Sequence, residues 1–173
     1  MKHTILTLLM IGLMVGCGKK EEAKTLTEKP KIEIPQSVFS TKMDKGISVL
    51  EARKHKAGDK ITVQGKIMGS MSPFVEGRAS FIIGDPAKLT SCDLKEGDPC
   101  ETPWDVCCDD SQDIADSTLS IQLVDKNGKV LKTGLKGING LKELSNVVVE
   151  GTVDSSSNEM VMIINAESIS VLN

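Results

Sequence analysis

Aromatic residues are scarce in this chain of 173 residues. There is no Tyr, Trp104 is the single Trp, and with three Phe the aromatics make up 2% of the sequence. Proteins that bind single-stranded nucleic acid need aromatic side chains on which bases stack, together with a positively charged groove. A formal net charge of −3 does not favour such a groove. We therefore expect no nucleic-acid partner.

Histidine is equally rare, with only two residues. His3 lies in an N-terminal segment that we expect to be removed, and His55 lies in the basic stretch 53–56. A serine hydrolase needs a His beside both its nucleophile and a carboxylate, and the motif G-x-S-x-G is missing. The Gly-rich stretch 134–140 is neither a P-loop nor a dinucleotide fingerprint. These absences predict a protein that is not an enzyme and has no histidine metal site.

The apolar run near the N-terminus is too short to span a bilayer. Residues 5–15 are almost entirely apolar, but a spanning helix needs roughly 20 such residues. Preceded by Lys2, the run is typical of the apolar region of a secretory signal peptide. We expect residues 1–16 to be removed on export, which leaves enough chain for one domain with a tail.

The end of this run indicates lipid attachment. The sequence Met14-Val15-Gly16-Cys17 resembles the lipobox of bacterial lipoproteins, with Met14 in the place of the usual Leu. The resemblance implies that Cys17 becomes the acylated N-terminus, which anchors the protein to a membrane. No Asp follows Cys17, so nothing resembles the inner-membrane retention signal. The expected location is the periplasmic face of the outer membrane, within the cell envelope.

The segment after Cys17 differs in composition from the rest of the chain. Residues 17–43 are rich in Lys and Glu, contain Pro30 and Pro35, and show no sustained periodicity. This composition predicts a flexible tether, whose end can dock on the domain through Ile32, Ile34, Val38 and Phe39. We expect residues 44–173 to form the folded domain.

Alternating apolar and polar residues predict five strands in the domain. The expected strands cover residues 60–67, 78–84, 118–125, 147–153 and 159–172. Asn127-Gly128 supplies the positive φ angles of a tight hairpin turn. Residues 48–55 are expected to form one or two turns of helix. The predicted fold class is therefore mainly β, a small five-stranded antiparallel barrel.

Two glycines refine this prediction. Gly65 and Gly151 occupy matching positions inside the first and fourth expected strands, and glycine within a strand marks a sharp bend or a close backbone approach. The strand order, these two glycines and the closing segment 163–169 resemble an OB-fold over residues 58–172. The resemblance implies the fold alone, because OB-folds carry unrelated functions.

A long acidic loop containing four cysteines separates the second and third expected strands. Residues 91–116 hold nine acidic residues and one base, Lys95, whereas the whole chain has a net charge of −3. The loop cysteines are Cys92, Cys100, Cys107 and Cys108. An even number of cysteines in an exported protein first predicts disulfides. We expect the loop to be stapled by two of them.

Geometry restricts the pairing of these cysteines. The Cα atoms of adjacent Cys107 and Cys108 lie about 3.8 Å apart, below the usual disulfide range of about 4.4–6.8 Å. We therefore favour Cys92 and Cys100 each bonded to one of Cys107 and Cys108. The alternatives are a metal site, in which four thiolates hold zinc or copper(I), and thiol redox chemistry. The spacing lacks the C-x2-C pairs of ordinary zinc sites.

The carboxylates of the loop are candidates for binding Ca²⁺, which prefers oxygen ligands. The candidate residues are Asp105, Asp109, Asp110 and Asp113. They do not form an EF-hand pattern, so a solvated anionic surface is the preferred interpretation and no cofactor is expected.

Taken together, these features predict a non-catalytic, lipid-anchored envelope protein. We expect it to act as a binding or assembly module for an envelope protein or small ligand. Metal-binding or thiol-redox chemistry at the cysteines is the alternative, and an OB-fold nucleic-acid binder is the less favoured one.

Overall fold

A computed structural model describes residues 34–172 of the chain, apart from Thr41 and Asp98. These residues all belong to one compact unit, residues 31–173. The expected signal peptide, Cys17 and residues 18–33 of the expected tether lie outside the described residues. None of the helices described is long and apolar enough to cross a membrane.

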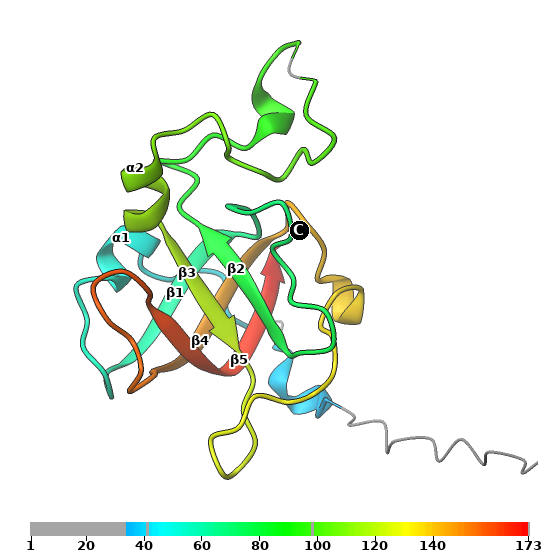
Figure 1. Ribbon diagram of the computed structural model, residues 1–173. Coiled ribbons are helices and arrows are strands. Elements are labelled where there is room, and N and C mark those ends of the chain that lie inside the picture. Colours follow the sequence, from blue (N-terminus) through cyan, green and yellow to red (C-terminus); the bar gives the residue numbers. More distant parts are fainter. Residues whose placement is uncertain (1–33, 41, 98, 173) are drawn as a thin grey trace, which may run out of the picture. The chain divides into compact units, whose positions relative to one another are not determined.

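The described chain forms a closed barrel of five strands, as the sequence predicts (Figure 1). The strands are β1 (Lys60–Lys66), β2 (Ser80–Gly84), β3 (Thr118–Gln122), β4 (Asn146–Val153) and β5 (Ile163–Leu172). Helical segments are short: η1 (Gln36–Val38), α1 (Val49–Ala52), η2 (Cys92–Leu94), α2 (Ser111–Asp116) and η3 (Ile138–Gly140). The fold is therefore mainly β with few helices.

The expectation of a purely antiparallel barrel is wrong for one pair of strands. Around the barrel the strands follow the order β1-β2-β3-β5-β4, and β3 runs parallel to β5, with Ser120 opposite Ile163. The other neighbouring pairs are antiparallel. The physical reason is the odd number of strands: five strands in a closed ring cannot alternate in direction throughout, so at least one pair is parallel.

The alternation that predicts the strands also builds the core. In β1, Ile61 and Val63 point inward, while Thr62 and Gln64 are more exposed. Inward side chains from all five strands form one continuous apolar cluster, which includes Phe81 and Ile121. The N-terminal part of the described chain packs on this cluster through Ile34 and Phe39, and Phe39 forms a parallel bridge with Ile169 of β5.

Gly151 marks a close approach between two strands. A Cβ atom at this position would lie 2.9 Å from the Cα atom of Ala166 and closer still to the carbonyl oxygen of Asn165. The pairing of β4 with β5 shifts register between Glu150 and Gly151. A bulge of this kind bends the strand, and here it lets the long β5 close the barrel.

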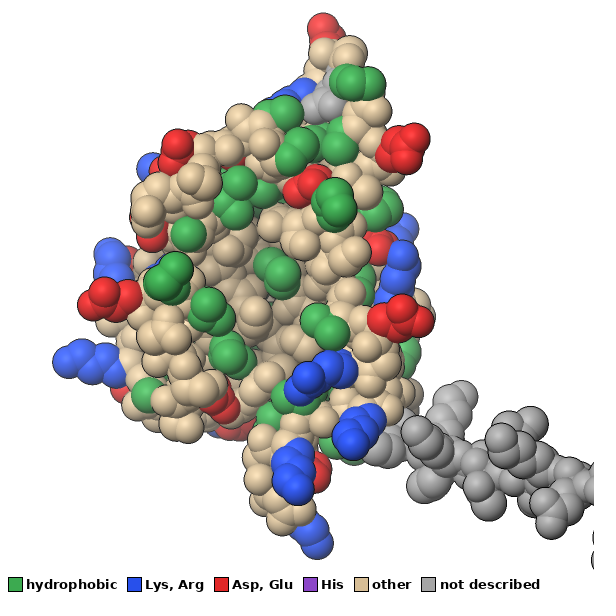
Figure 2. Space-filling model, in the orientation of Figure 1, with side chains coloured by type: hydrophobic (Ala, Val, Ile, Leu, Met, Phe, Trp, Pro, Cys, Tyr) green, Lys and Arg blue, Asp and Glu red, His purple; other side chains and the backbone are tan. Residues whose placement is uncertain are grey.

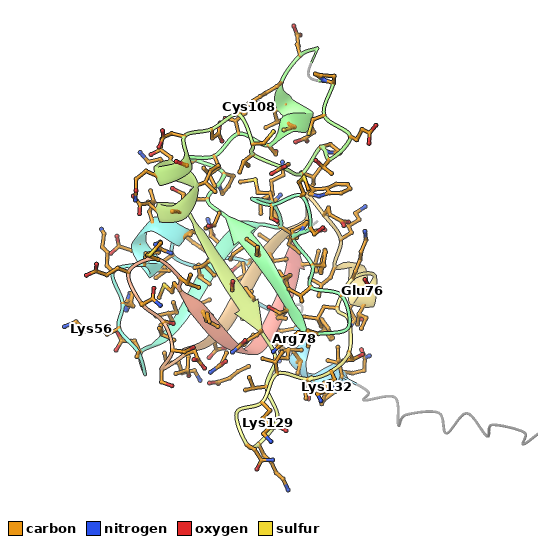
Figure 3. The ribbon with its side chains drawn as sticks, in the orientation of Figure 1. Lys56, Glu76, Arg78, Cys108, Lys129 and Lys132 are labelled. Carbon is orange, nitrogen blue, oxygen red and sulfur yellow. The ribbon has the colours of Figure 1, made fainter. Side chains whose placement is uncertain are left out.

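The acidic loop and the hairpin that follows β3 lie at opposite ends of the barrel (Figure 1). The hairpin turns at Asn127-Gly128, as expected, and Val124 pairs with Val130. Lys129 and Lys132 belong to this end, whereas Cys108 belongs to the loop end (Figure 3). On the face shown in Figure 2, Lys and Arg side chains gather around the hairpin. The segment η1, where the chain enters the barrel, also lies at the hairpin end.

Candidate functional site

The acidic loop has its own attachments to the barrel. The backbone N–H of Gly69, just after β1, donates to the carbonyl of Trp104 at 3.3 Å, and Lys66 of β1 donates to Ser91 Oγ at 2.9 Å. A second small core of Met68, Leu89 and Val106, with Ile114 packed against it, lies beneath the loop. The loop is therefore ordered by packing and hydrogen bonds that do not involve its cysteines.

Two segments of the loop pair with each other. The backbone N–H of Cys92 donates to the carbonyl of Asp105 (2.8 Å), and that of Asp93 donates to the carbonyl of Pro103 (2.9 Å). These bonds join the short helix η2 to the segment that carries Trp104. Cys92 is thereby held facing the later part of the loop, with its side chain buried.

A tight turn brings the adjacent cysteines to the same place. The backbone N–H of Asp109 donates to the carbonyl of Val106 at 2.9 Å, so Cys107 and Cys108 occupy the two central positions of a β-turn. Neighbouring side chains in a strand would point to opposite faces. In this turn their sulfur atoms lie 4.0 Å apart, and both residues are exposed.

The sulfur atoms of the loop converge. Cys92 Sγ lies 3.9 Å from Cys107 Sγ, and those two atoms and Cys108 Sγ all lie within 4.8 Å of one another. A disulfide bond is about 2.05 Å long, so the Cys92–Cys107 and Cys107–Cys108 separations are non-bonded contacts. Cys100 Sγ interacts with Thr102, at 3.2 Å from its hydroxyl oxygen.

The thiols of the group differ in acidity. Burial, together with contacts with Cys100 and Cys107, raises the pKa of Cys92 to about 12. Hydrogen bonds from Thr102 lower the pKa of Cys100. Cys100 is therefore the more acidic of these two thiols. The buried Cys92 thiol, with its high pKa, is a poor nucleophile.

Positive side chains border the sulfur atoms. Lys95 Nζ lies 3.2 Å from Asp109 Oδ1. Burial lowers the pKa of Lys95, but Asp109 and the nearby Cys108 and Cys92 raise it overall. Lys66 Nζ donates to Ser91 Oγ at 2.9 Å, next to Cys92. Negative charge on the cysteines would therefore be partly balanced.

The carboxylates predicted as cation ligands are dispersed. Asp105 is buried and accepts from the N–H of Val106, and Asp109 accepts from the N–H of Thr90 as well as Lys95. Asp110 caps the N-terminus of α2, whose first turn contains Asp113. Among residues 34–172, except for the two gaps, these four do not converge as a metal-ligating group.

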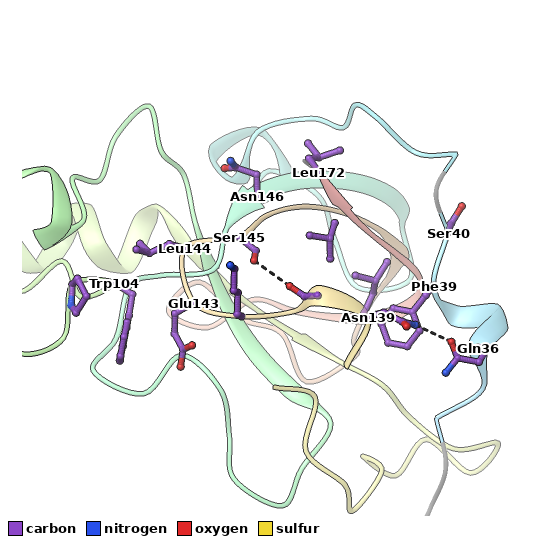
Figure 4. A pocket seen from close by; sticks show the side chains of 15 residues that line it. Gln36, Phe39, Ser40, Trp104, Asn139, Glu143, Leu144, Ser145, Asn146 and Leu172 are labelled. Carbon is purple, nitrogen blue, oxygen red and sulfur yellow. Dashed lines mark hydrogen bonds between the residues drawn. The ribbon is translucent and has the colours of Figure 1, made fainter. Parts of the chain in front are cut away.

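A groove on the barrel beside the loop was not predicted from the sequence. It has a volume of about 1000 Å³, and Trp104 lies at one end of it while Gln36 and Phe39 lie at the other (Figure 4). Its walls come from η1, the loop, the segment before β4 and the end of β5. No sequence signal links these distant segments, because each contributes only a few residues.

Trp104 is half-buried in the wall of this groove. Its indole N–H donates to the carbonyl of Met71 at 2.9 Å. Lys136 Nζ lies 5.8 Å from the centre of its ring and pairs with Glu143 at 2.5 Å. Lys136 thus links the loop to the segment that precedes β4.

His55, the only histidine among the described residues, lies at a second, smaller cavity of about 420 Å³. Its Nδ1 atom is 3.3 Å from Asp59 Oδ2, and the side chain is partly exposed. This pair connects residues four positions apart in the segment between α1 and β1, and it resembles an ordinary surface contact.

Comparison of the chain with family models, with curated proteins and with solved structures finds no match.

Proposed function

We propose that this protein is a non-catalytic, lipid-anchored binding module of the cell envelope, with the acidic loop of residues 91–116 as its binding element. The observation that carries the proposal is the placement of this loop. It extends from the end of the barrel opposite to η1, the first helical segment of the described chain. The loop therefore stands clear of the end of the barrel where the described chain begins.

The barrel serves as the support in this proposal. Five strands closed into a ring, with β1 beside both β2 and β4, support an OB-like fold. β5 is paired on both sides, by β3 and β4, and Ile47 bridges to Val63 on the side of β1 that faces away from β4. In this proposal a ligand therefore uses loops or grooves. The loop adjoins the Trp104 groove, which gives the module a continuous surface for recognition.

The disulfide staples expected from the sequence are not needed to hold the loop in place. The second small core and the hydrogen bonds from Lys66 to Ser91 and from Trp104 to Met71 already attach it. In this proposal the cysteines of the loop take part in ligand binding.

The anchor is tested by metabolic labelling with palmitate. We expect the full chain to incorporate the label and to fractionate with membranes, and the variant Cys17→Ala to lose the label. Cys108→Ala is the matched control and should keep it. Label that persists in Cys17→Ala, or intact unlipidated protein among the soluble intracellular proteins, would contradict the proposal.

A further inference from the structure

We infer that Cys92, Cys107 and Cys108 bind one thiophilic d¹⁰ metal ion, Zn²⁺ or Cu⁺, with Cys100 as the nearest candidate for a fourth ligand. The inference deepens the proposed binding function, on which it rests, by naming the ligand class. It depends on the convergence of three sulfur atoms from two separate segments of the loop.

The spacing of the sulfur atoms fits a single ion. Metal–sulfur bonds of about 2.3 Å place the sulfurs of a tetrahedral site about 3.8 Å apart and those of a trigonal site about 4.0 Å apart. The Cys92–Cys107 distance of 3.9 Å and the Cys107–Cys108 distance of 4.0 Å agree with both geometries. The third separation, between Cys92 Sγ and Cys108 Sγ, is at most 4.8 Å, so a small movement of one side chain brings all three sulfur atoms to one ion.

The backbone holds these ligands in position before any ion binds. The bond from Asp109 N–H to Val106 C=O closes the turn that aligns Cys107 with Cys108. The bond from Cys92 N–H to Asp105 C=O fixes Cys92 opposite that turn. A site built on fixed backbone loses little entropy on binding, which favours affinity.

The charge balance also fits. Binding proceeds as Zn²⁺ plus three thiols giving a tris-thiolate complex of charge −1 and three released protons. Lys95, which contacts Asp109 and lies near Cys92 and Cys108, offsets this charge. Cys100 is adjacent to Cys92 and completes four sulfur ligands if Thr102 releases it.

The ligand atoms define the class of metal. Thiolates favour Zn²⁺ and Cu⁺, whereas Ca²⁺ and Mg²⁺ require oxygen. Within the described part of the chain, the group that converges contains sulfur and no carboxylate. We therefore assign the site to a soft metal ion and interpret the loop carboxylates as solvated surface groups.

The test uses the full lipidated chain, extracted in detergent and reduced under exclusion of oxygen. Co²⁺ is added as a spectroscopic probe, and Zn²⁺ and Cu⁺ then compete for it in separate titrations. We expect one Co²⁺ per chain with thiolate-to-cobalt charge-transfer absorption, displaced by one equivalent of Zn²⁺ or Cu⁺.

Substitutions identify the ligands. Cys107 and Cys108 are exposed, so Cys107→Ser and Cys108→Ser should keep the barrel folded, as checked by circular dichroism. Each should weaken metal binding about 100-fold or more. Loss of a residue that only supports a metal ligand already weakens binding by up to about 100-fold, and these residues are ligands themselves. Asp113→Asn, which changes an exposed carboxylate in the same loop, is the matched control and should bind normally.

Three results would overturn the inference. They are the absence of charge-transfer absorption with all three metals, binding unchanged in both serine variants, and envelope-isolated protein that contains two loop disulfides and no metal. Palmitate labelling at Cys17 is independent of all three. A labelled protein without metal would refute this inference alone, and an unlabelled protein that binds metal would refute the anchor.

Discussion

At the scale of single residues, Gly151 is the position where the barrel tolerates least change. A Cβ atom there would collide with the backbone of Asn165 and Ala166, which cannot move without disturbing the pairing of β4 with β5. We expect Gly151→Ala to lower the free energy of unfolding by about 2–3 kcal/mol, measured by urea denaturation. Gly134→Ala, where nothing lies within 4 Å, should change it by less than about 0.5 kcal/mol. Equal effects would contradict this account of Gly151.

Asp154 gives the fold a dependence on acidity. Its carboxylate accepts from the N–H (2.8 Å) and hydroxyl (2.5 Å) of Ser156 and from the amide of Asn165 (2.6 Å). The hydroxyl of Ser156, then its N–H, then Asn165 lower the pKa of Asp154 below its ordinary value. A lowered folded-state pKa means that the stabilisation is complete above the unfolded-state pKa of about 3.9 and is lost as the pH falls through the folded value.

The variant Asp154→Asn tests this dependence. We expect it to be about 1 kcal/mol less stable than the unaltered chain at pH 7, since it loses charge-assisted hydrogen bonds at a partly solvated site. The difference should shrink as the pH is lowered below about 4, as followed by urea denaturation at each pH. The exposed Asp44→Asn is the control. If the difference in unfolding free energy stays constant down to pH 2, the effect of Asp154→Asn comes from the changed shape of the side chain and not from its lost charge.

At the scale of elements, Lys136 connects the loop to the segment before β4. Its ammonium group lies over the ring of Trp104 and pairs with Glu143. We expect Lys136→Met to increase the quenching of Trp104 fluorescence by acrylamide, because the ring loses its charged partner, while the unfolding free energy changes by less than about 1 kcal/mol. Lys132→Met, at the hairpin end, should leave the fluorescence unchanged. Trp104 is the single Trp, so the signal reports the surroundings of this ring alone.

The strands could be predicted from the sequence, but their neighbours could not. Alternation in β1 identifies Ile61 and Val63 as inward-facing, and the structure agrees. Alternation does not say which strand lies beside β5, so the parallel pairing of Ser120 with Ile163 was missed. The candidate site divides in the same way. The sequence groups the cysteines in one loop, but the turn that aligns Cys107 with Cys108 depends on a backbone hydrogen bond that no side-chain pattern encodes.

At the scale of the whole molecule, the loop and the barrel have separate cores. The loop rests on Met68, Leu89 and Val106, apart from the main apolar cluster of the barrel. Units with separate cores can open separately, and the unit with fewer buried contacts opens at the lower free energy. A metal ion that joins Cys92 to the 106–109 turn would therefore suppress opening of the loop and leave the barrel almost unaffected.

Limited proteolysis with trypsin can detect this difference within one chain. Lys95 lies in the loop, and Lys129 lies in the hairpin at the other end of the barrel. If Zn²⁺ is present at about 100 times its Kd, linkage stabilises the closed loop by about 2.7 kcal/mol, so cleavage after Lys95 should slow by up to about 100-fold. Cleavage after Lys129 should keep its rate, and a chelator should restore cleavage after Lys95. Equal protection of both sites would mean that the loop and the barrel open together, and protection that persists in Cys107→Ser would show that the effect does not come from the cysteine site.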